Sequence, residues 1–515
     1  MMAIPLALLA AVSGLGLAAA GNFCGTTAGC IYPYPADSVQ GVAAPGKPPP
    51  TLNPAIFITS CLPAGHPACA ATVTPALARL RSRLFTQQDT QSGPSSVVQL
   101  QVTLTGSAAA TPLQLGVNES YVLEVPDPGP RMVVTIRAPT EWGALWGLES
   151  FAQSVDLIPG TAHGFFPENP SQPAYVLGLW PPARIADAPR TAWRGLLVDT
   201  SRHFLSVPTL ERVITAMSMA KMNALHFHVV DGDGWALCLD SLKHVCETRA
   251  YRDPYGAWSE TSTWNTIPCL YPLTGVPILR LGAGAPAIYT PAQLRHIVAF
   301  ATARGVRVIP EFDLPGHIAG PLCAAEPSLC VAGCAPDPSN PRWWAFLKAV
   351  VAEMAEIFPD TFVHGGADEF HPECWLADPK LAAWARRQQP PMTTAHDVLD
   401  YFHVQWQQML LDAGRRPMFW DEFFWVYDAP TPTRKNLTIL PGTSASLRGI
   451  TGDRGPMIKT EYAGDLGEWE QSLAAGIPSI NTGISEMWYL DRVAKICDDQ
   501  PGGCACSIQQ TASLL

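Results

Sequence analysis

The spacing of hydrophobic and polar positions changes near residue 190. Before this point, residues 97–104 (VVQLQVTL) alternate apolar and polar side chains, which is typical of a half-buried strand. Residues 121–125 and 132–138 have the composition of further strands, and 140–155 has the apolar spacing of a helix. Strands followed by one long helix predict a small α+β domain, which we place at residues 21–185.

Beyond residue 190, strand patterns and helix patterns alternate, which predicts a parallel β/α architecture. The segment Thr290-Pro291-Ala292-Gln293 is a capping box that opens one of the helices. The predicted strands are 194–199, 223–231, 306–317, 361–370, 416–422, 437–442 and 477–491, and the predicted helices are 207–223, 290–304, 342–358, 395–414 and 464–476. This order predicts a (β/α)8 TIM barrel over residues 186–491, of which we find seven strands and no eighth. Residues 492–515 form a cysteine-containing tail.

Composition narrows the class of protein. The chain has 515 residues, of which 47% are hydrophobic and 15% charged, and this suits a globular protein with a large core. Its formal net charge of −11 argues against a nucleic-acid partner, which would favour a basic face. No Lys- or Arg-rich run indicates a polybasic membrane-binding patch.

The N-terminus and the cysteines indicate the secretory pathway. Residues 1–20 are apolar, carry no charge and end in small residues, which predicts a signal peptide; an uncleaved membrane anchor is the alternative. Fourteen cysteines predict disulfides rather than zinc sites, because no CxxC pairs stand at finger-like spacing. We expect Cys374 to pair with Cys323, Cys330 or Cys334. Sequons at Asn118 and Asn436 agree with an extracellular or lysosomal/vacuolar glycoprotein.

Polar side chains collect at the carboxyl ends of the predicted strands. Taken singly, such an Asp is most often a loop cap, and a Trp is most often part of the core. Several strand ends that agree indicate an active site, because the loops after barrel strands converge on one mouth. The residues concerned are Asp199, Asp231, Asp313, His317, Asp368, Glu369, Trp420, Glu422, Tyr489 and Asp491.

The centre of this predicted site is the segment HGGADE, residues 364–369. If the site desolvates Glu369 and the carboxyl of Asp368 repels it, the pKa of one of the two groups rises, and that group stays protonated as a general acid. We expect the glycines to let the backbone and a sugar approach each other closely.

Several motifs resemble those of family 20 glycoside hydrolases, the β-N-acetylhexosaminidases, in the same order along the chain. The resemblance covers roughly residues 95 to 491. Its motifs are WRGLLVDTSRHFLSV (193–207), HFHVVD (226–231), RVIPEFDLPGH (307–317), HGGADEFHPECW (364–375), FWDE (419–422) and WYLD (488–491).

The resemblance implies an exo-acting hydrolase in which the substrate's own 2-acetamido oxygen is the nucleophile. Glu369 would protonate the glycosidic oxygen and Asp368 would orient the acetamido N–H, while Asp231 and His317 would form a hydrogen-bonded relay to Glu369. Tyr489 would donate to the acetamido oxygen, and Trp420 would line the acetyl group. Arg194, Asp491 and Glu422 would bind the sugar, and His228 would support the relay or be an ordinary core histidine.

The implied substrate is a glycan that ends in N-acetylhexosamine, either GlcNAc or GalNAc, with no cofactor and no metal. We expect no nucleic-acid partner and no membrane anchor after signal cleavage, and a homodimer stays open. Three features depart from the family pattern: Ala367 in place of a glycine, Asp231-Gly232 in place of paired aspartates, and no tryptophan in 441–449. These departures and the unseen eighth strand leave a carbohydrate-binding pseudoenzyme or a truncated isoform as the alternative. A glycosidase with a protein nucleophile is a third reading.

Overall fold

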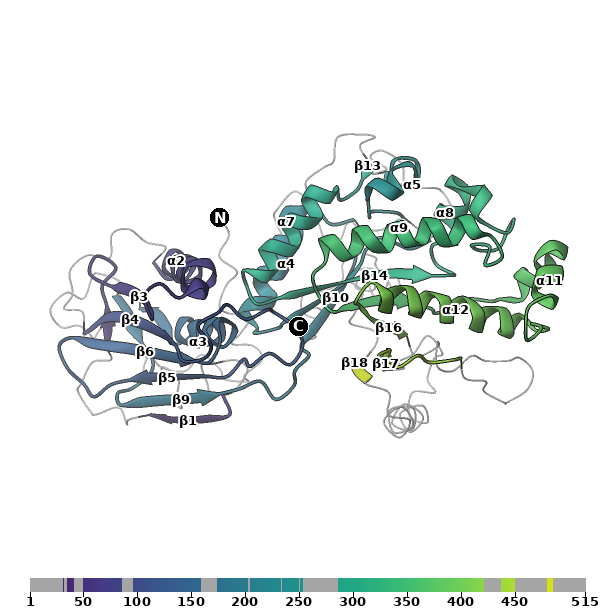
Figure 1. The fold of residues 1–515 in the computed structure, drawn as a ribbon. Coiled ribbons are helices and arrows are strands. Elements are labelled where there is room, and N and C mark those ends of the chain that lie inside the picture. The colour runs from purple at the N-terminus through teal and green to yellow at the C-terminus, as the bar shows by residue number, and fades with distance from the viewer. Residues whose placement is uncertain are drawn as a thin grey trace, which may run out of the picture. The chain divides into compact units, whose positions relative to one another are not determined.

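The structure is a computed structural model, which describes residues 31, 35–40, 50–85, 96–158, 174–201, 204–232, 234–249, 251–252, 286–420, 437–449 and 479–484. The chain divides into two compact units (Figure 1). The first comprises Met1–Arg194, Ile214–Asn223 and Thr302–Val306, and the second comprises the remaining residues. The predicted signal peptide and the predicted tail lie outside the described residues.

The first unit contains a nine-stranded mixed sheet in the order β1-β9-β5-β6-β4-β2-β8-β7, with β3 paired to β4. The predicted strands 97–104, 121–125 and 132–138 are β4, β5 and β6, so the α+β prediction is confirmed. The strand bounds are β1 Asp37–Gln40, β2 Thr51–Leu52, β3 Ile58–Leu62, β4 Val97–Leu104, β5 Tyr121–Val125, β6 Met132–Ala138, β7 Val155–Ile158, β8 Ala174–Leu177 and β9 Ala183–Asp187. Because β9 ends at Asp187, this unit extends past the boundary we placed at residue 185.

Helix α3 (Glu141–Gln153) forms the centre of this unit's core and contacts strands β4, β5, β6 and β7. Thr140 caps it by accepting a hydrogen bond from the Gly143 N–H at 3.2 Å. Gly147 is required there, because a Cβ at that position would lie 2.6 Å from Ile136. Helix α2 (Thr74–Leu84) packs beside α3, as Figure 1 shows. The predicted helix over 140–155 is therefore confirmed.

The second unit contains a seven-stranded parallel sheet in the order β10-β11-β14-β15-β16-β17-β18. Neighbouring strands follow one another along the chain, and helices connect the strands from β10 to β16, which is the order of a β/α barrel. The strands are β10 Gly195–Asp199, β11 Ala224–His228, β14 Arg307–Leu314, β15 Phe362–Gly366, β16 Arg416–Trp420, β17 Ser444–Gly449 and β18 Ser479–Ile484.

The described residues around this sheet form eight α-helices, and four of them match predicted helices, those that begin at residues 207, 291, 341 and 395. The eight are α4 Val207–Met219, α5 Lys243–Arg249, α7 Pro291–Thr302, α8 Ala319–Ala325, α9 Pro341–Ile357, α10 Glu373–Ala377, α11 Pro379–Arg386 and α12 Ala395–Asp412; β12 (Tyr251–Arg252) and β13 (Pro286–Ala287) form a separate pair. In the described residues no helix is both long and apolar enough to cross a membrane. The predicted helix 464–476 lies outside those residues.

One predicted strand was wrong. We placed the sixth at 437–442, but β17 begins at Ser444. Pro441 and Gly442 form a turn, which the Thr443 N–H closes on the Leu440 carbonyl at 3.1 Å, and Gly442 has a φ of +99°. Proline and glycine disfavour a continuous strand at this point, so the apolar run before them is the approach to the strand.

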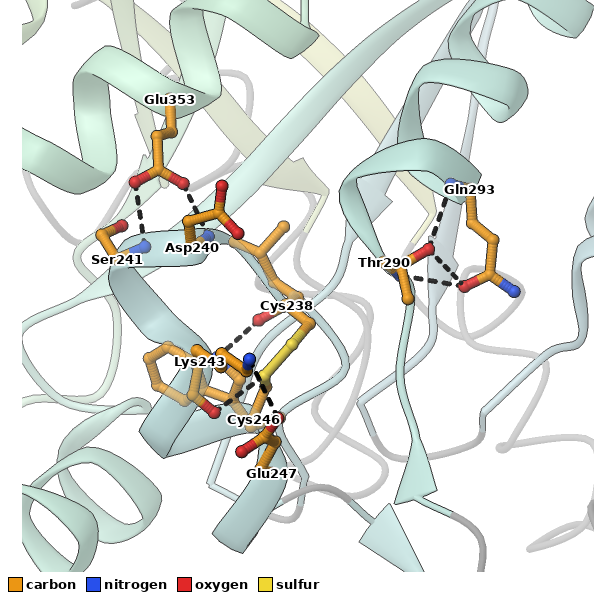
Figure 2. Close-up of a disulfide and its surroundings, with 11 residues drawn as sticks. Cys238, Asp240, Ser241, Lys243, Cys246, Glu247, Thr290, Gln293 and Glu353 are labelled. Atoms are coloured by element: carbon orange, nitrogen blue, oxygen red, sulfur yellow. Dashed lines mark hydrogen bonds and ion pairs between the residues drawn. A yellow bond between two sulfur atoms is a disulfide. The ribbon is translucent and has the colours of Figure 1, made fainter.

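Local contacts fix the helix starts of the second unit, as Figure 2 shows. The capping box predicted at the start of α7 forms: Thr290 N–H donates to Gln293 Oε1 at 2.9 Å, and Gln293 N–H donates to Thr290 Oγ1 at 3.3 Å. Glu353 of α9 accepts from the N–H groups of Asp240 and Ser241 at 2.8 and 2.9 Å, where a short helical turn leads into α5.

Four disulfides occur in the described residues, which supports the prediction of an oxidised, secreted chain. Cys374 pairs with Cys334, one of its three predicted partners. That bond joins the segment after β14 to helix α10, which follows the HGGADE segment. The other pairs are Cys61–Cys69, Cys238–Cys246 (Figure 2) and Cys323–Cys330.

Candidate active site

Four of the predicted site residues meet beyond the carboxyl ends of β11, β14 and β15. His317 stands at the centre: its Nδ1 lies 3.0 Å from Asp231 Oδ1, and its Nε2 lies 3.3 Å from Glu369 Oε2 and 3.7 Å from Asp368 Oδ2. Asp231 in turn accepts a hydrogen bond from His228 Nε2 at 2.8 Å. The structure therefore brings together the residues that the sequence analysis assigned to the acid and its relay.

The turn that carries the two carboxyls has an unusual backbone. Gly366, Ala367 and Glu369 all have positive φ, at +69°, +78° and +52°. At Gly366 only glycine fits, because a Cβ there would lie 1.7 Å from Asp313 Oδ1. The same Asp313 oxygen accepts a hydrogen bond from the Ala367 N–H at 3.1 Å. The buried carboxyl of Asp313 thus holds the turn that presents Asp368 and Glu369.

The glycines of HGGADE serve a different purpose from the one expected. A Cβ on Gly365 would lie 2.3 Å from the Phe419 ring and 2.6 Å from Trp406 Nε1. Together with the contact at Gly366, this shows that both glycines make room for the protein's own side chains. Close approach of a sugar does not explain them.

The two neighbouring carboxyls differ sharply in exposure. The side chain of Glu369 is 61% exposed and that of Asp368 is 5% exposed. The protein itself therefore does not desolvate Glu369 in the way that the sequence analysis supposed. A sugar that covers the site would have to exclude water from this carboxyl.

Asp313 is a carboxyl of this site whose pKa is raised. Burial raises its pKa well above the ordinary value, and the negative charge of Asp368 raises it further. Asp313 is only 1% exposed and lies on β14, so a neutral carboxyl there is consistent with its position beneath Asp368 and Glu369. The negative charge of Asp368 thus acts on Asp313, and the repulsion that we expected between Asp368 and Glu369 stays a prediction.

Both histidines of the relay favour the protonated form. Burial lowers the pKa of His317, but its hydrogen bonds to Asp231 and Glu369 and the nearby carboxylates outweigh this and raise the pKa to about 11. Burial also lowers the pKa of His228, yet Glu311, Asp199 and Asp231 raise it well above the ordinary value. The relay is thus a chain of alternating anions and cations.

Glu311 is a functional candidate that the sequence analysis missed. It is fully buried on β14 and lies 2.6 Å from His226 Nε2, 2.6 Å from His228 Nδ1 and 3.1 Å from His364 Nδ1. Trp420 Nε1–H donates to Glu311 Oε1 at 2.7 Å, whereas His226 and His228 face Oε2. The available signal was the spacing in the segment EFD: Glu311 and Asp313 are two apart on one strand and so point to the same face.

Arg194 was assigned wrongly to the sugar. It precedes β10, whereas Asp199 ends that strand, and five residues of strand separate the two positions by about 16 Å. Its guanidinium pairs with Glu119 at 2.6 Å and donates to the carbonyls of Lys221 and Thr191. These contacts account for its buried charge within the first unit. The other arginine of the same motif, Arg202, follows Asp199 in the sequence and lies outside the described residues.

Of the remaining predicted site residues, the described part of the structure contains Trp420. Trp420 is the last residue of β16 and is 2% exposed. Its ring lies 4.5 Å from that of His364 and 5.4 Å from that of His226, centroid to centroid. Glu422, Tyr489 and Asp491 lie outside the described residues, so their roles stay predictions.

Several of these side chains are of the types that bind metal ions in proteins. In the described residues four groups of histidines and carboxylates place ligand atoms within 4.8 Å of one another, among them His226, Glu311 and His364. Within that group, however, the imidazole nitrogens stand at hydrogen-bond distance from the carboxylate oxygens. His226 Nε2 is thus hydrogen-bonded to Glu311, whereas His364 Nδ1 accepts from the Gly366 N–H at 3.2 Å.

Comparison with known proteins identifies the class of the fold and the site. The family model "Glycosyl hydrolase family 20, catalytic domain" matches residues 192–440, and a second model, "beta-acetyl hexosaminidase like", matches residues 31–154. The chain belongs to glycosyl hydrolase family 20, with a TIM-barrel catalytic domain that follows an N-terminal α+β domain.

Individual relatives agree with this assignment. The chain is 30% identical to the beta-hexosaminidase subunit beta of Sus scrofa over 409 residues, which cover 77% of this chain and 62% of the relative. It is 32% identical to beta-hexosaminidase 1 of Arabidopsis thaliana, over 61% of this chain and 50% of the relative. The solved chitobiase of Flavobacterium johnsoniae has a TM-score of 0.60 at 23% identity and matches 94% of this chain and 63% of its own.

The chain spans about three fifths of the length of the curated relatives that it matches, 62%, 61% and 58% for the subunits beta of Sus scrofa, Mus musculus and Homo sapiens. Family membership and fold follow from these matches.

Proposed function

We propose that this protein is an exo-acting β-N-acetylhexosaminidase that removes terminal GlcNAc or GalNAc from glycoconjugates or chitin oligomers. The observation that carries the proposal is the convergence of Glu369 and Asp368 on one edge of His317, at 3.3 and 3.7 Å from Nε2. One of these carboxyls is exposed and the other is buried, which suits them to different tasks.

Glu369 is the general acid of this proposal. Its exposed carboxyl reaches the space where a glycosidic oxygen would bind, and His317 stands behind it as a hydrogen-bond partner. When Glu369 gives its proton to the leaving oxygen it becomes an anion, which the His317 imidazolium stabilises. The same carboxylate then takes a proton from the water that completes hydrolysis.

Asp368 suits the task of holding the substrate's 2-acetamido group. A carboxylate with little exposure can accept the acetamido N–H and stabilise the positive charge that develops when the acetamido oxygen attacks the anomeric carbon. Trp420 is the proposed neighbour of the acetyl methyl group, and Tyr489 the donor to the acetamido oxygen. Asp491 and Glu422 are the proposed partners of the sugar hydroxyls.

The experiment is hydrolysis of an aryl β-N-acetylglucosaminide by the full chain and by Glu369→Gln. A matched control is Glu356→Gln, which makes the same change on a side chain that is 68% exposed on α9. We expect turnover by the wild type and the control, with a loss of about 100-fold or more in Glu369→Gln. Equal rates in wild type and Glu369→Gln would contradict the proposal and leave a carbohydrate-binding protein as the reading.

A second measurement separates substrate assistance from a protein nucleophile. A thiazoline that mimics the cyclised acetamido group should inhibit competitively, because the site would be complementary to that intermediate. Covalent trapping of a sugar on Asp368 would contradict this assignment. The disulfides further support passage through the secretory pathway, and we propose an extracellular or lysosomal/vacuolar location.

A further inference from the structure

Glu311 is a fully buried carboxylate on β14 to which the proposed function assigns no contact with the substrate. Four nitrogens surround Glu311 at distances between 2.6 and 3.1 Å, those of His226, His228, His364 and Trp420. His226, His228 and Trp420 can donate to this carboxylate, whereas His364 Nδ1 accepts a hydrogen bond from the Gly366 N–H at 3.2 Å.

The register of the sheet explains why these side chains meet. His228 stands opposite Glu311, Glu311 opposite His364, and His364 opposite Met418. Trp420 lies two residues beyond Met418 and therefore points to the same face of its strand. Four adjacent parallel strands, β11, β14, β15 and β16, thus contribute to one layer of side chains around Glu311.

Two separate arms leave this layer toward the proposed active site. One arm runs from Glu311 through His228 and Asp231 to His317, and it ends at Glu369. The other arm is the single bond from Glu311 to the indole of Trp420. We infer that Glu311 is a positioning residue that fixes the acid relay and the acetyl-contacting tryptophan together. This inference rests on the proposed hexosaminidase function.

The charge on Glu311 gives the first arm its protonation state. Burial raises the pKa of Glu311, but the charges of His228, His364 and His226 lower it by more, to well below the ordinary value. The anion in turn keeps His228 protonated, together with Asp199 and Asp231. Asp313 and His317 complete the titratable groups that face this cluster in the described residues. A protonated His228 can donate from both ring nitrogens, to Asp231 and to Glu311.

The test variant is Glu311→Gln, which keeps the shape but cannot accept three hydrogen bonds. In this variant His228 loses one of the three anions that keep it protonated, so the pKa of His228 falls. The basic limb of the pH profile of kcat/KM is the range in which kcat/KM falls as the pH rises. We therefore expect this limb to move to lower pH by at least about one unit. We also expect the affinity for the thiazoline to fall roughly tenfold or more, because Trp420 loses its charged acceptor.

Two further variants each disrupt one arm and leave the other intact. His228→Gln should move the basic limb and leave thiazoline affinity unchanged. Trp420→Phe, which keeps an aromatic ring but removes the N–H, should weaken the thiazoline and leave the limb in place. The matched control is Asp360→Asn: this buried carboxylate pairs with Arg307 at 3.0 Å, where the same strands β14 and β15 begin. Asp360→Asn should lower the stability of the protein without changing the basic limb or the affinity for the thiazoline.

The outcomes separate the inference from the function on which it rests. No turnover by the wild-type chain contradicts the proposed hydrolase. Turnover by the wild type, with an unshifted limb and unchanged thiazoline affinity in folded Glu311→Gln, overturns the positioning role alone. If Glu311→Gln does not fold, His228→Gln carries the test, and an unshifted limb in that variant overturns the inference.

Discussion

Adding one methyl group to the turn before the catalytic pair should be far more damaging than removing one from the next residue. Gly366 has a φ of +69°, and a Cβ there would lie 1.7 Å from Asp313 Oδ1 and 2.5 Å from Asp313 Cα. The second atom belongs to the backbone, so a change of rotamer cannot relieve the contact. The substitution Gly366→Ala must therefore separate β14 from the turn.

The magnitude follows from two separate costs. A non-glycine residue in the left-handed region costs about 1–2 kcal/mol, and overpacking of a buried site costs about 1–3 kcal/mol. We therefore expect Gly366→Ala to lower the free energy of unfolding by roughly 2–5 kcal/mol. The shift should also break the hydrogen bond between Ala367 N–H and Asp313 and lower kcat/KM.

The opposite change, Ala367→Gly, should be nearly neutral. Glycine relieves the strain of the +78° φ, but it loses a buried methyl group worth about 0.8 kcal/mol and adds about 0.5–1 kcal/mol of chain entropy to the unfolded state. Its free energy of unfolding should stay within about 1 kcal/mol of wild type.

Urea unfolding of both variants, followed by tryptophan fluorescence, measures the two values. The buried Trp343, Trp375 and Trp406 report on the unit that contains the turn. A Gly366→Ala protein within about 0.5 kcal/mol of wild type, the range of an ordinary surface substitution, would refute the contact with Asp313.

Three further perturbations have defined outcomes. Replacing Cys334 and Cys374 by serine opens a 40-residue loop and should lower the free energy of unfolding by about 4 kcal/mol. The same replacement of Cys238 and Cys246 opens an eight-residue loop and should lower it by about 2.5 kcal/mol. Equal losses in chemical unfolding would contradict the loop-entropy reasoning. Because the pKa of His317 is raised to about 11, its stabilisation is complete below about pH 6.5 and is lost as the pH rises toward 11. The difference in free energy of unfolding between wild type and His317→Gln should shrink from pH 7 to 10, by at most about 1.4 kcal/mol per pH unit. A difference that grows with pH would contradict the raised pKa of His317. Glu353→Gln, which weakens the helix cap seen in Figure 2, should lower the melting temperature and leave kcat unchanged; a lower kcat would contradict a purely structural role.

Hydrophobic periodicity was sufficient for most of the fold, because buried parallel strands are continuous apolar runs bounded by turn residues. It failed at 437–442, where an apolar run ends in Pro441-Gly442 and the strand begins only after the turn. The meeting of Asp231, His317 and Glu369 was predictable because all three follow strand ends, whereas their role as a relay was implied by the family resemblance.

Two misses at the site have physical causes. Glu311 lies inside a strand and not at its end, so the search for polar residues at strand ends passed over it. Arg194 belongs to a motif that spans both ends of β10, and the motif alone does not say which arginine faces the site. In both cases the direction of a side chain, set by its position along the strand, decides the role.

The central claim is that Glu369 gives a proton to the leaving group. Its most direct test is the rate of Glu369→Gln, relative to wild type, across aryl β-N-acetylglucosaminides whose phenols differ in acidity. A more acidic phenol leaves as its anion and needs less protonation, so the deficit of the variant should be large for weakly acidic phenols and shrink as acidity rises. The same deficit with every phenol, or none with any, would contradict the assignment of Glu369 as the acid.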